Sequence, residues 1–183
     1  MVYNTSMIIL TGASASGKTV TALDLQKRYG LVKAITTTTR EMRTGETNGV
    51  EYFFVSKEEF EKRLKEHKFV EHTLYNGNYY GCGIDQVADN KIIVLDPNGL
   101  HSFLKLNNKN IVSFLLLADE KTREERMRGR GDKEENITKR LQNDVEDFSL
   151  EKIGKVDFII KTQDKTIEEV SDIIYKSYKK KIA

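Results

Sequence analysis

The sequence predicts an α/β fold of three layers, in which helices cover both faces of a central parallel sheet. Five short runs of apolar and β-branched residues are separated by helical patterns or by longer connections, as in parallel strands joined by helical crossovers. The first run leads through a glycine-rich loop into a helical pattern. Two further stretches of different composition predict a small antiparallel insertion and a helical lid.

We expect a single domain over residues 1–183, because a chain of this length buries one sizeable core. The predicted core strands are residues 7–10, 32–35, 92–95, 111–117 and 158–160. The core is then expected to consist of segments 1–35, 86–119 and 152–183. The insertion is expected at about 36–85 and the lid at about 120–151.

The glycine-rich loop after the first strand fits every fixed position of the phosphate-binding pattern G-x-x-x-x-G-K-[ST]. Its glycines allow backbone N–H groups to surround a β-phosphate, its lysine can reach the β and γ oxygens, and its threonine hydroxyl can ligate Mg²⁺. We therefore expect this segment to bind the phosphates of a nucleotide. Its residues are Gly12, Ala13, Ser14, Ala15, Ser16, Gly17, Lys18, Thr19 and Val20.

The insertion is predicted from strand and turn signals between the second and third core strands. A strand-like run at 51–55 precedes a helix, whose predicted capping box begins at Ser56 and includes Glu59. Two more strands, 69–75 and 78–82, are expected to form an antiparallel pair through a turn at Asn76 and Gly77.

Two arginines, Arg40 and Arg43, lie three residues apart beside a glycine-rich turn at the start of the insertion. Such a pair can hold a phosphate dianion through planar, bidentate contacts. Taken alone, these residues are equally compatible with surface arginines that pair with Glu41 and Glu46.

Asp96 directly follows the apolar run 92–95, so it is expected at the carboxyl end of a central strand. That location favours a role in binding Mg²⁺, directly or through water. The alternative is an aspartate that caps the turn after the strand.

The charged segment at about 120–151 predicts two helices around a glycine hinge at 128–131, which could move as a lid. Arg126 and Arg130 are four residues apart and therefore share a helix face, while Arg140 belongs to the second helix. The alternative is a solvated face on which the arginines pair with neighbouring acidic residues, namely Glu124, Glu125 and Glu134.

The last predicted element is an amphipathic helix over residues 166–180, followed by a solvated lysine run at 179–181. The residues expected on its apolar side are Ile167, Val170, Ile173, Ile174 and Tyr178.

The composition excludes several classes of protein. Thirty basic residues are nearly balanced by twenty-eight acidic ones, and the net charge of +2 does not predict a nucleic-acid partner. A single cysteine excludes an internal disulfide and any multi-cysteine metal site. No apolar run has the length of a membrane span or a signal peptide. We expect a cytoplasmic enzyme with no membrane partner, as a monomer or a homodimer.

Beyond these patterns, the chain resembles the guanylate kinase family. The pieces T-T-R-x-x-R-x-G-E-x-[ND]-G-x-[DE]-Y-x-F, F-[IVL]-E and G-x-x-Y-G, which are characteristic of that family, occur here in order. Together with the phosphate loop, the similarity extends from about residue 8 to residue 140 and becomes looser beyond it. The resemblance implies a P-loop NTPase fold with a GMP-binding insertion, and ATP-dependent phosphoryl transfer to GMP that gives GDP and ADP, with Mg²⁺ as cofactor.

The resemblance also implies roles for individual residues. Lys18, Arg40, Arg126, Arg130 and Arg140 would be catalytic, and the last three would close over the transferring phosphoryl group. Thr19 and Asp96 would hold the metal. The GMP-binding residues would be Thr36, Arg40, Arg43, Glu46, Tyr52, Glu71, Tyr80, Cys82 and Asp96, with Glu71 and Thr36 on the base.

Elementary chemistry supports the assignment of Glu71 separately. Guanine presents two adjacent donors, N1–H and the 2-amino group, and one ionised carboxylate can accept from both in parallel. Adenine instead has an acceptor at N1 and no 2-amino group. The alternatives are an exposed strand residue at Glu71, and simple core packing for Tyr52 and Tyr80.

Four departures indicate a divergent member of the family. Ala13 and Ala15 replace the usual proline and glycine of the loop, and Cys82 replaces a hydroxyl residue. The segment after Asp96 is shortened, and Thr162 stands near the position of an asparagine that contacts adenine. Two rival functions remain open: a kinase of the same fold with another nucleotide or sugar-phosphate acceptor, and a non-catalytic binding domain.

Overall fold

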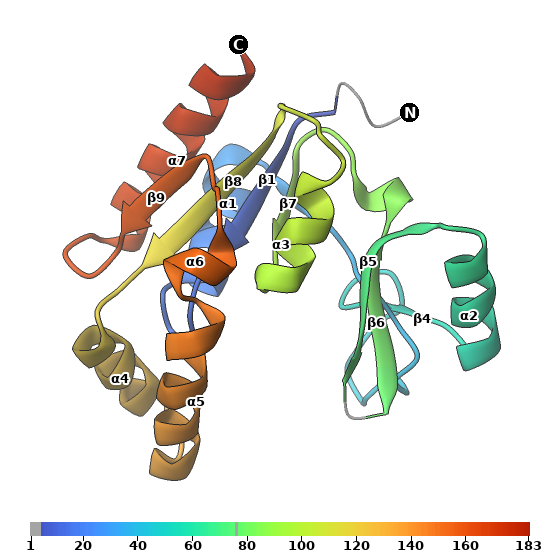
Figure 1. Cartoon of the computed structure of the whole chain (residues 1–183), viewed down its shortest axis with the longest axis horizontal. Helices are drawn as coiled ribbons and strands as arrows, with labels where there is room; N and C mark the ends of the chain where they lie inside the picture. Colours follow the sequence, from blue (N-terminus) through green and yellow to red (C-terminus); the bar gives the residue numbers. More distant parts are fainter. Residues whose placement is uncertain (1–4, 76) are drawn as a thin grey trace.

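A computed structural model describes residues 5–75 and 77–183, and its centre is a five-stranded parallel sheet in the order β2-β7-β1-β8-β9. The strands are β1 (Met7–Thr11), β2 (Val32–Lys33), β7 (Lys91–Val94), β8 (Ile111–Leu117) and β9 (Phe158–Lys161). The parallel α/β core predicted from the sequence is therefore confirmed (Figure 1).

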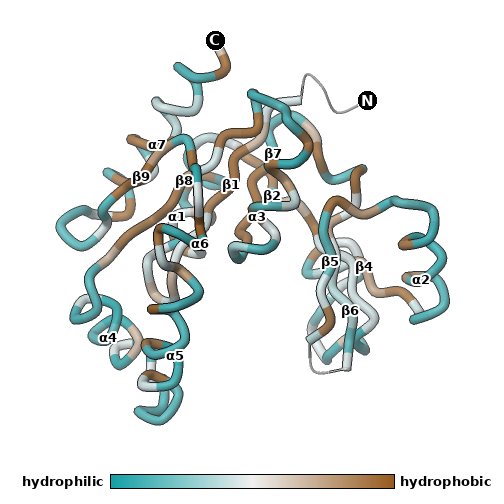
Figure 2. Tube along the Cα trace, viewed as in Figure 1, coloured by the Kyte–Doolittle hydropathy of each residue, from teal (hydrophilic) through white to brown (hydrophobic). Residues whose placement is uncertain are grey.

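Alternation along the central strands divides the core into two apolar layers. Ile8 and Leu10 face α1 (Lys18–Tyr29) and α7 (Ile167–Ile182), whereas Met7 and Ile9 face α3 (Pro97–Leu104) and the short α6 (Leu150–Ile153). Successive side chains of a strand point to opposite faces, so a sheet covered on both sides reads as a continuous apolar run. Figure 2 shows this apolar band along the core strands and the mostly hydrophilic residues of the lid helices.

The second core strand differs from its prediction. Residues 32–35 were expected to form a buried strand, but β2 contains only Val32 and Lys33, and both are exposed. The physical reason is position: β2 is an edge strand that pairs with β7 alone. The buried residue here is Ala34, just beyond the strand.

The insertion contains a four-stranded sheet in the order β4-β3-β6-β5. Its elements are β3 (Thr37–Thr38), β4 (Phe53–Phe54), α2 (Lys57–Lys65), β5 (Phe69–Tyr75), β6 (Asn78–Gly83) and a 3-10 turn, η1 (Ile84–Gln86). The antiparallel pairing of β5 with β6 agrees with the prediction, but β3 was not predicted and pairs in parallel with β4. Asn76, half of the predicted turn, lies outside the described residues.

Ser56 caps α2 as expected, by accepting a hydrogen bond from the Glu59 N–H at 3.1 Å. The Glu59 carboxylate accepts instead from Arg63, one turn further along the helix. A complete capping box is found at α7, where Thr166 and Glu169 exchange both hydrogen bonds.

The two predicted lid helices are present as α4 (Glu120–Gly129) and α5 (Glu134–Asp147). The chain between them includes Gly131 in the left-handed region, with φ of 86°. The last helix, α7, buries Val170, Ile174 and Tyr178, but Ile167 and Ile173, which were expected on the same side, are 43% and 37% exposed. Within the described residues, no helix combines the length and apolarity that a membrane span needs.

All five core strands run in the same direction, so their carboxyl ends meet at one edge of the sheet. The phosphate loop follows β1, Asp96 follows β7, the lid follows β8, Thr162 follows β9 and the insertion follows β2. Figure 1 shows the lid and the insertion extending beyond this edge. Ligands of open α/β sheets bind at this edge, so the residues gathered there are the candidates for a functional site.

Candidate active site

The phosphate loop connects β1 to α1, so its last residues form the first turn of a helix. The N–H groups of that turn have no partner within the helix, and together with the helix dipole they favour an anion. Gly12 has φ of 146°, and a Cβ there would collide with the Leu116 carbonyl of β8. The pattern therefore requires glycine at this position because the loop packs directly against the sheet.

Lys18 folds back over the loop, where its Nζ donates hydrogen bonds to the Gly12 carbonyl at 2.6 Å and to the Ala13 carbonyl at 2.7 Å. The Phe148 ring lies 5.9 Å from the same nitrogen. Burial lowers the pKa of Lys18 to about 8, while the nearby Asp144 carboxylate acts in the opposite direction. An anion that replaced the two carbonyls would stabilise the charged form of Lys18 and raise its pKa.

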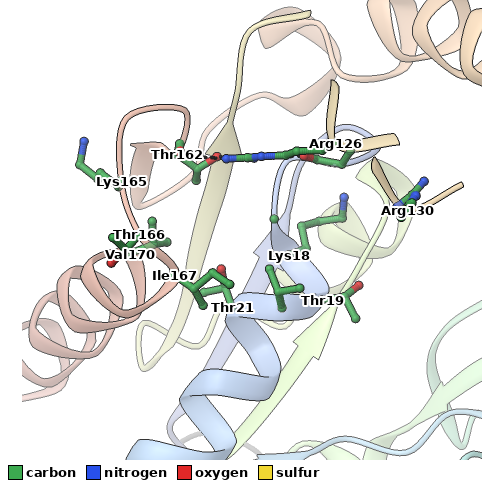
Figure 3. Close-up of a pocket in the computed structure, with 13 residues that line it drawn as sticks. Lys18, Thr19, Thr21, Arg126, Arg130, Thr162, Lys165, Thr166, Ile167 and Val170 are labelled. Atoms are coloured by element: carbon green, nitrogen blue, oxygen red, sulfur yellow. Dashed lines mark hydrogen bonds between the residues drawn. The ribbon is translucent and has the colours of Figure 1, made fainter. Parts of the chain in front are cut away.

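Beside Lys18 lies a cavity of about 380 Å³ (Figure 3). It is lined by the loop, by lid residues Arg126 and Arg130, and by the start of α7. The α7 side contributes Thr162, Lys165, Thr166, Ile167 and Val170. Apart from Thr162, these residues were not predicted to line the site, because Ile167 and Val170 have the spacing of an ordinary helix face.

Arg126 is directed toward the loop and α7. Its guanidinium donates to the Ala15 carbonyl at 3.1 Å, and to the hydroxyl and carbonyl of Thr162 at 3.2 and 3.0 Å. The acidic partners proposed in the alternative interpretation do not hold it. In this arrangement Arg126 forms a wall of the cavity, and its predicted contact with a transferring phosphoryl group stays a prediction.

Arg130 and Arg140 share one acidic partner, Asp132, at 2.6 and 3.4 Å. Arg130 also lines the cavity, and its charge contributes to the lowered pKa of Lys18. Both ion pairs are largely exposed, and exposed ion pairs contribute little to stability. The two guanidiniums can therefore exchange Asp132 for an anionic ligand at low energetic cost.

On the insertion, the structure brings together Arg40, Glu46, Tyr52 and Tyr80. Arg40 forms an ion pair with Glu46 at 2.7 Å, and its guanidinium lies 5.6 Å from the centre of the Tyr52 ring. The Tyr52 and Tyr80 rings make an edge contact with centres 5.9 Å apart. The hydrogen bond from Arg40 lowers the pKa of Glu46.

Two other predicted GMP-binding residues are less directly tied to this group. Arg43 joins it through its backbone N–H, which donates to Glu46 at 2.8 Å. Thr36 precedes β3, and its carbonyl accepts from the Phe53 N–H at 3.0 Å. The ion pair between Arg40 and Glu46 was the alternative to phosphate binding for this arginine, and it is present in this structure.

A second group is formed by Glu71 and Cys82 of the insertion together with Asp96 of the core. Glu71 lies in β5, where the pairing register with β6 shifts, and its carboxylate accepts from the Cys82 N–H at 2.9 Å. Burial raises the pKa of Glu71 to about 6, and the charge of Asp96 acts in the same direction. Glu71 is therefore a partly buried carboxylate and not a fully exposed strand residue.

Cys82 takes part through its backbone. Its side chain is fully buried, and the thiol contacts the Gly83 carbonyl at 3.7 Å. Burial raises the pKa of the Cys82 thiol to about 12, with the charge of Glu71 as a second cause.

Asp96 caps α3, where its carboxylate accepts from the Gly99 N–H at 2.7 Å. This is the capping role considered as the alternative for Asp96. The predicted contact of Asp96 with metal or substrate stays a prediction.

Three lid residues near the loop were missed from the sequence. Arg123 and Asp144 form a buried ion pair at 2.8 Å, and Asp144 also accepts from the Ser14 N–H at 2.9 Å. Phe148 lies over Lys18. The signal for Arg123 was weak, since it lies three residues before Arg126 in a segment dense with charge.

Comparison with known proteins decides the family, because the family model for guanylate kinase matches residues 4–177. The chain belongs to the guanylate kinase family. A guanylate kinase of Fusobacterium nucleatum is 32% identical over 163 residues, which cover 85% of this chain and 86% of the relative. One of Nostoc sp. is 37% identical over 150 residues, which cover 78% of this chain and 75% of the relative.

The fold agrees as well. The crystal structure of guanylate kinase from Anaplasma phagocytophilum matches with a TM-score of 0.68 at 24% identity, covering 97% of this chain and 86% of that chain. The structure places two of the positions at which this chain departs from the family pattern, Ala15 and Thr162. Ala15 adopts φ of 59°, a left-handed conformation that favours glycine. Thr162 is buried between the loop and Arg126.

Proposed function

We propose that the protein transfers the γ-phosphoryl group of ATP to GMP, which gives ADP and GDP. The observation that carries this proposal is the pairing of two sites at one edge of the sheet. One is the phosphate loop with its adjoining cavity, and the other is the insertion, which presents an arginine for phosphate and a carboxylate for guanine.

ATP binding begins at the loop. The free N–H groups at the start of α1 would surround the β-phosphate, and Lys18 would leave the Gly12 and Ala13 carbonyls to reach the β and γ oxygens. The cavity beside Lys18, walled by Arg126 and Ile167, has room for the nucleoside part of ATP.

The residues at the loop fit a Mg²⁺ ion that arrives with ATP. Thr19 supplies a hydroxyl to the cavity, and phosphate oxygens and waters complete the oxygen set that Mg²⁺ prefers. In the described part of the chain, no cluster of three His, Cys, Asp or Glu side chains is placed to hold a metal ion. When bound, Mg²⁺ neutralises charge on the β- and γ-phosphates.

GMP binding uses the two groups on the insertion. Arg40 can release Glu46 to hold the GMP phosphate, with the Tyr52 and Tyr80 hydroxyls as further donors. Ionised Glu71 would accept from guanine N1–H and the 2-amino group, since the Cys82 N–H already orients the carboxylate.

The chemical step needs no general base, because the second pKa of a phosphate monoester is about 6 and GMP is largely a dianion at neutral pH. The task of the protein is to bring two anions together. Lys18, Arg130 and Arg140 supply positive charge from the loop and the lid, and closure of the lid would exclude water.

The proposal is tested by initial-rate release of ADP from ATP and Mg²⁺, with and without GMP. We expect fast release only with GMP, and near-complete loss in Lys18→Met. Lys27→Met, an exposed lysine on the same helix, is the matched control and should be unaffected. Background rates for the wild-type protein with GMP would contradict the proposal.

A further inference from the structure

Consecutive carbonyl groups of the phosphate loop accept hydrogen bonds from side chains. Lys18 contacts the Gly12 and Ala13 carbonyls, and Arg126 contacts the Ala15 carbonyl. The Thr162 hydroxyl donates to the Ser16 carbonyl at 2.9 Å. In a trans peptide the N–H points away from the carbonyl, so each of these contacts also fixes the direction of the next N–H group of the loop.

The remaining residue of this series, Ser14, is held by both lid helices. Its N–H donates to Asp144 of α5 at 2.9 Å, and its carbonyl lies 3.5 Å from the guanidinium of Arg123 of α4. Arg123 and Asp144 are themselves paired at 2.8 Å, so the three residues form a closed triangle. We call Arg123, Asp144 and the Ser14 peptide groups the lid–loop clamp.

Burial makes the clamp energetically important. The side chains of Arg123 and Asp144 are only 8% and 10% exposed, in contrast to the other lid ion pairs. A buried charge without its partner is strongly unfavourable, whereas an ion pair of this kind adds little to stability over a well-packed apolar pair. Stability alone therefore does not account for a charged pair at this position.

The clamp also adjoins a strained residue. Ala15 follows Ser14 and has φ of 59°, a left-handed conformation that is unfavourable for a residue with a Cβ. Such a conformation persists only where the surroundings enforce it. Arg123 and Arg126 contact the carbonyls immediately before and at Ala15.

We propose that Arg123 and Asp144 are positioning residues that hold the phosphate loop in its ATP-binding conformation. They tie the loop to the base of the lid and, through the Ser14 carbonyl, fix the direction of the Ala15 N–H group toward the phosphates. The neighbouring Ser14 and Ser16 N–H groups donate to Asp144 and to the Ala13 carbonyl and hold the loop in shape. The proposal rests on the ATP site described above. It predicts that the clamp affects ATP binding far more than GMP binding.

The decisive variant is the double substitution Arg123→Met with Asp144→Ala. It removes both charges together, so no unpaired buried charge remains and the fold is expected to persist. Calorimetry would measure the Kd for ATP, and steady-state rates would give KM for ATP and for GMP. We expect the Kd and KM for ATP to rise about ten-fold or more, as for a lost charge-assisted hydrogen bond, with KM for GMP within two-fold.

Two further variants separate positioning from general stability. Asp147→Asn removes an exposed acid of the same helix whose partner is Lys152, and it should leave ATP binding unchanged. Adding Ala15→Gly to the double variant should recover part of the ATP affinity, because glycine adopts the left-handed conformation without strain.

The amide hydrogen-exchange rates of residues 13–16 measure how firmly the clamp holds the loop in the protein without ligand. We expect faster exchange in the double variant and wild-type exchange in Asp147→Asn. If the wild-type protein binds no ATP, the proposed function fails, and this exchange measurement still tests the clamp. Unchanged loop exchange, or an ATP Kd within two-fold of wild type in the double variant, would overturn the proposal.

Discussion

Replacing Glu71 with glutamine separates the effect of this residue on stability from its effect on GMP binding. Glutamine keeps an oxygen that can accept from the Cys82 N–H, but it removes the negative charge. Its amide group also places a donor where guanine presents donors. We therefore expect the Kd for GMP to rise roughly 30- to 1,000-fold, which corresponds to about 2–4 kcal/mol for lost charge-assisted hydrogen bonds.

The same substitution should leave the fold as stable or make it more stable. Burial raises the pKa of Glu71 from 4.5 to about 6, so the ionised carboxylate destabilises the folded protein above pH 6. A pKa difference of this size corresponds to about 2 kcal/mol at most. Wild-type stability should increase as the pH falls from about 6 toward 4.5, and this increment should be absent in Glu71→Gln, as urea denaturation at several pH values would measure.

The pH dependence of KM for GMP tests whether Glu71 binds the guanine base. Below pH 6, protonation of Glu71 should raise KM for GMP by up to ten-fold per pH unit in the wild-type protein. The GMP phosphate also titrates near pH 6, and Glu71→Gln reports that contribution alone. If wild type and Glu71→Gln have the same KM for GMP at pH 8, or the same pH profile, Glu71 does not read the base.

Three other predictions concern the remaining groups. Lys18→Met should lower kcat by at least about 100-fold without changing the melting temperature, as expected for a lost contact to transferring charge; an intermediate rate would assign the phosphate contact to another cation. Arg40→Met should abolish measurable turnover, while Arg63→Met, which replaces a half-buried arginine on α2 of the same insertion, should remain active; similar rates in the two would remove Arg40 from the phosphate site. Burial raises the pKa of Cys82 to about 12, so its thiol should react with a disulfide reagent at pH 8 only after unfolding, and rapid reaction of the native protein would contradict the buried position.

Much of the core follows from local sequence. β-Branched runs mark all five strands of the parallel sheet, and the phosphate-binding pattern places a loop between β1 and α1. The exposure of β2 was missed because an edge strand and a central strand can have the same composition. β3 was missed because two threonines are too short a run to show periodicity.

Contacts between distant segments were the least predictable part of the site. Arg123 and Asp144 are twenty-one residues apart in a charged segment, where charge normally indicates solvent exposure. Only the packing of α4 against α5 and the loop makes them a buried pair. Similarly, the sequence places Asp96 at a strand end, but whether its carboxylate caps a helix depends on the backbone that follows.

The most direct test of the whole account is a panel of phosphate acceptors at fixed ATP and Mg²⁺. Initial rates of ADP release would be compared for GMP, dGMP, AMP, CMP, UMP and no acceptor. We expect fast turnover with GMP and dGMP only, because in the proposed site Glu71 would accept from the donors of guanine. Turnover with AMP comparable to that with GMP, or background rates with every acceptor, would contradict it.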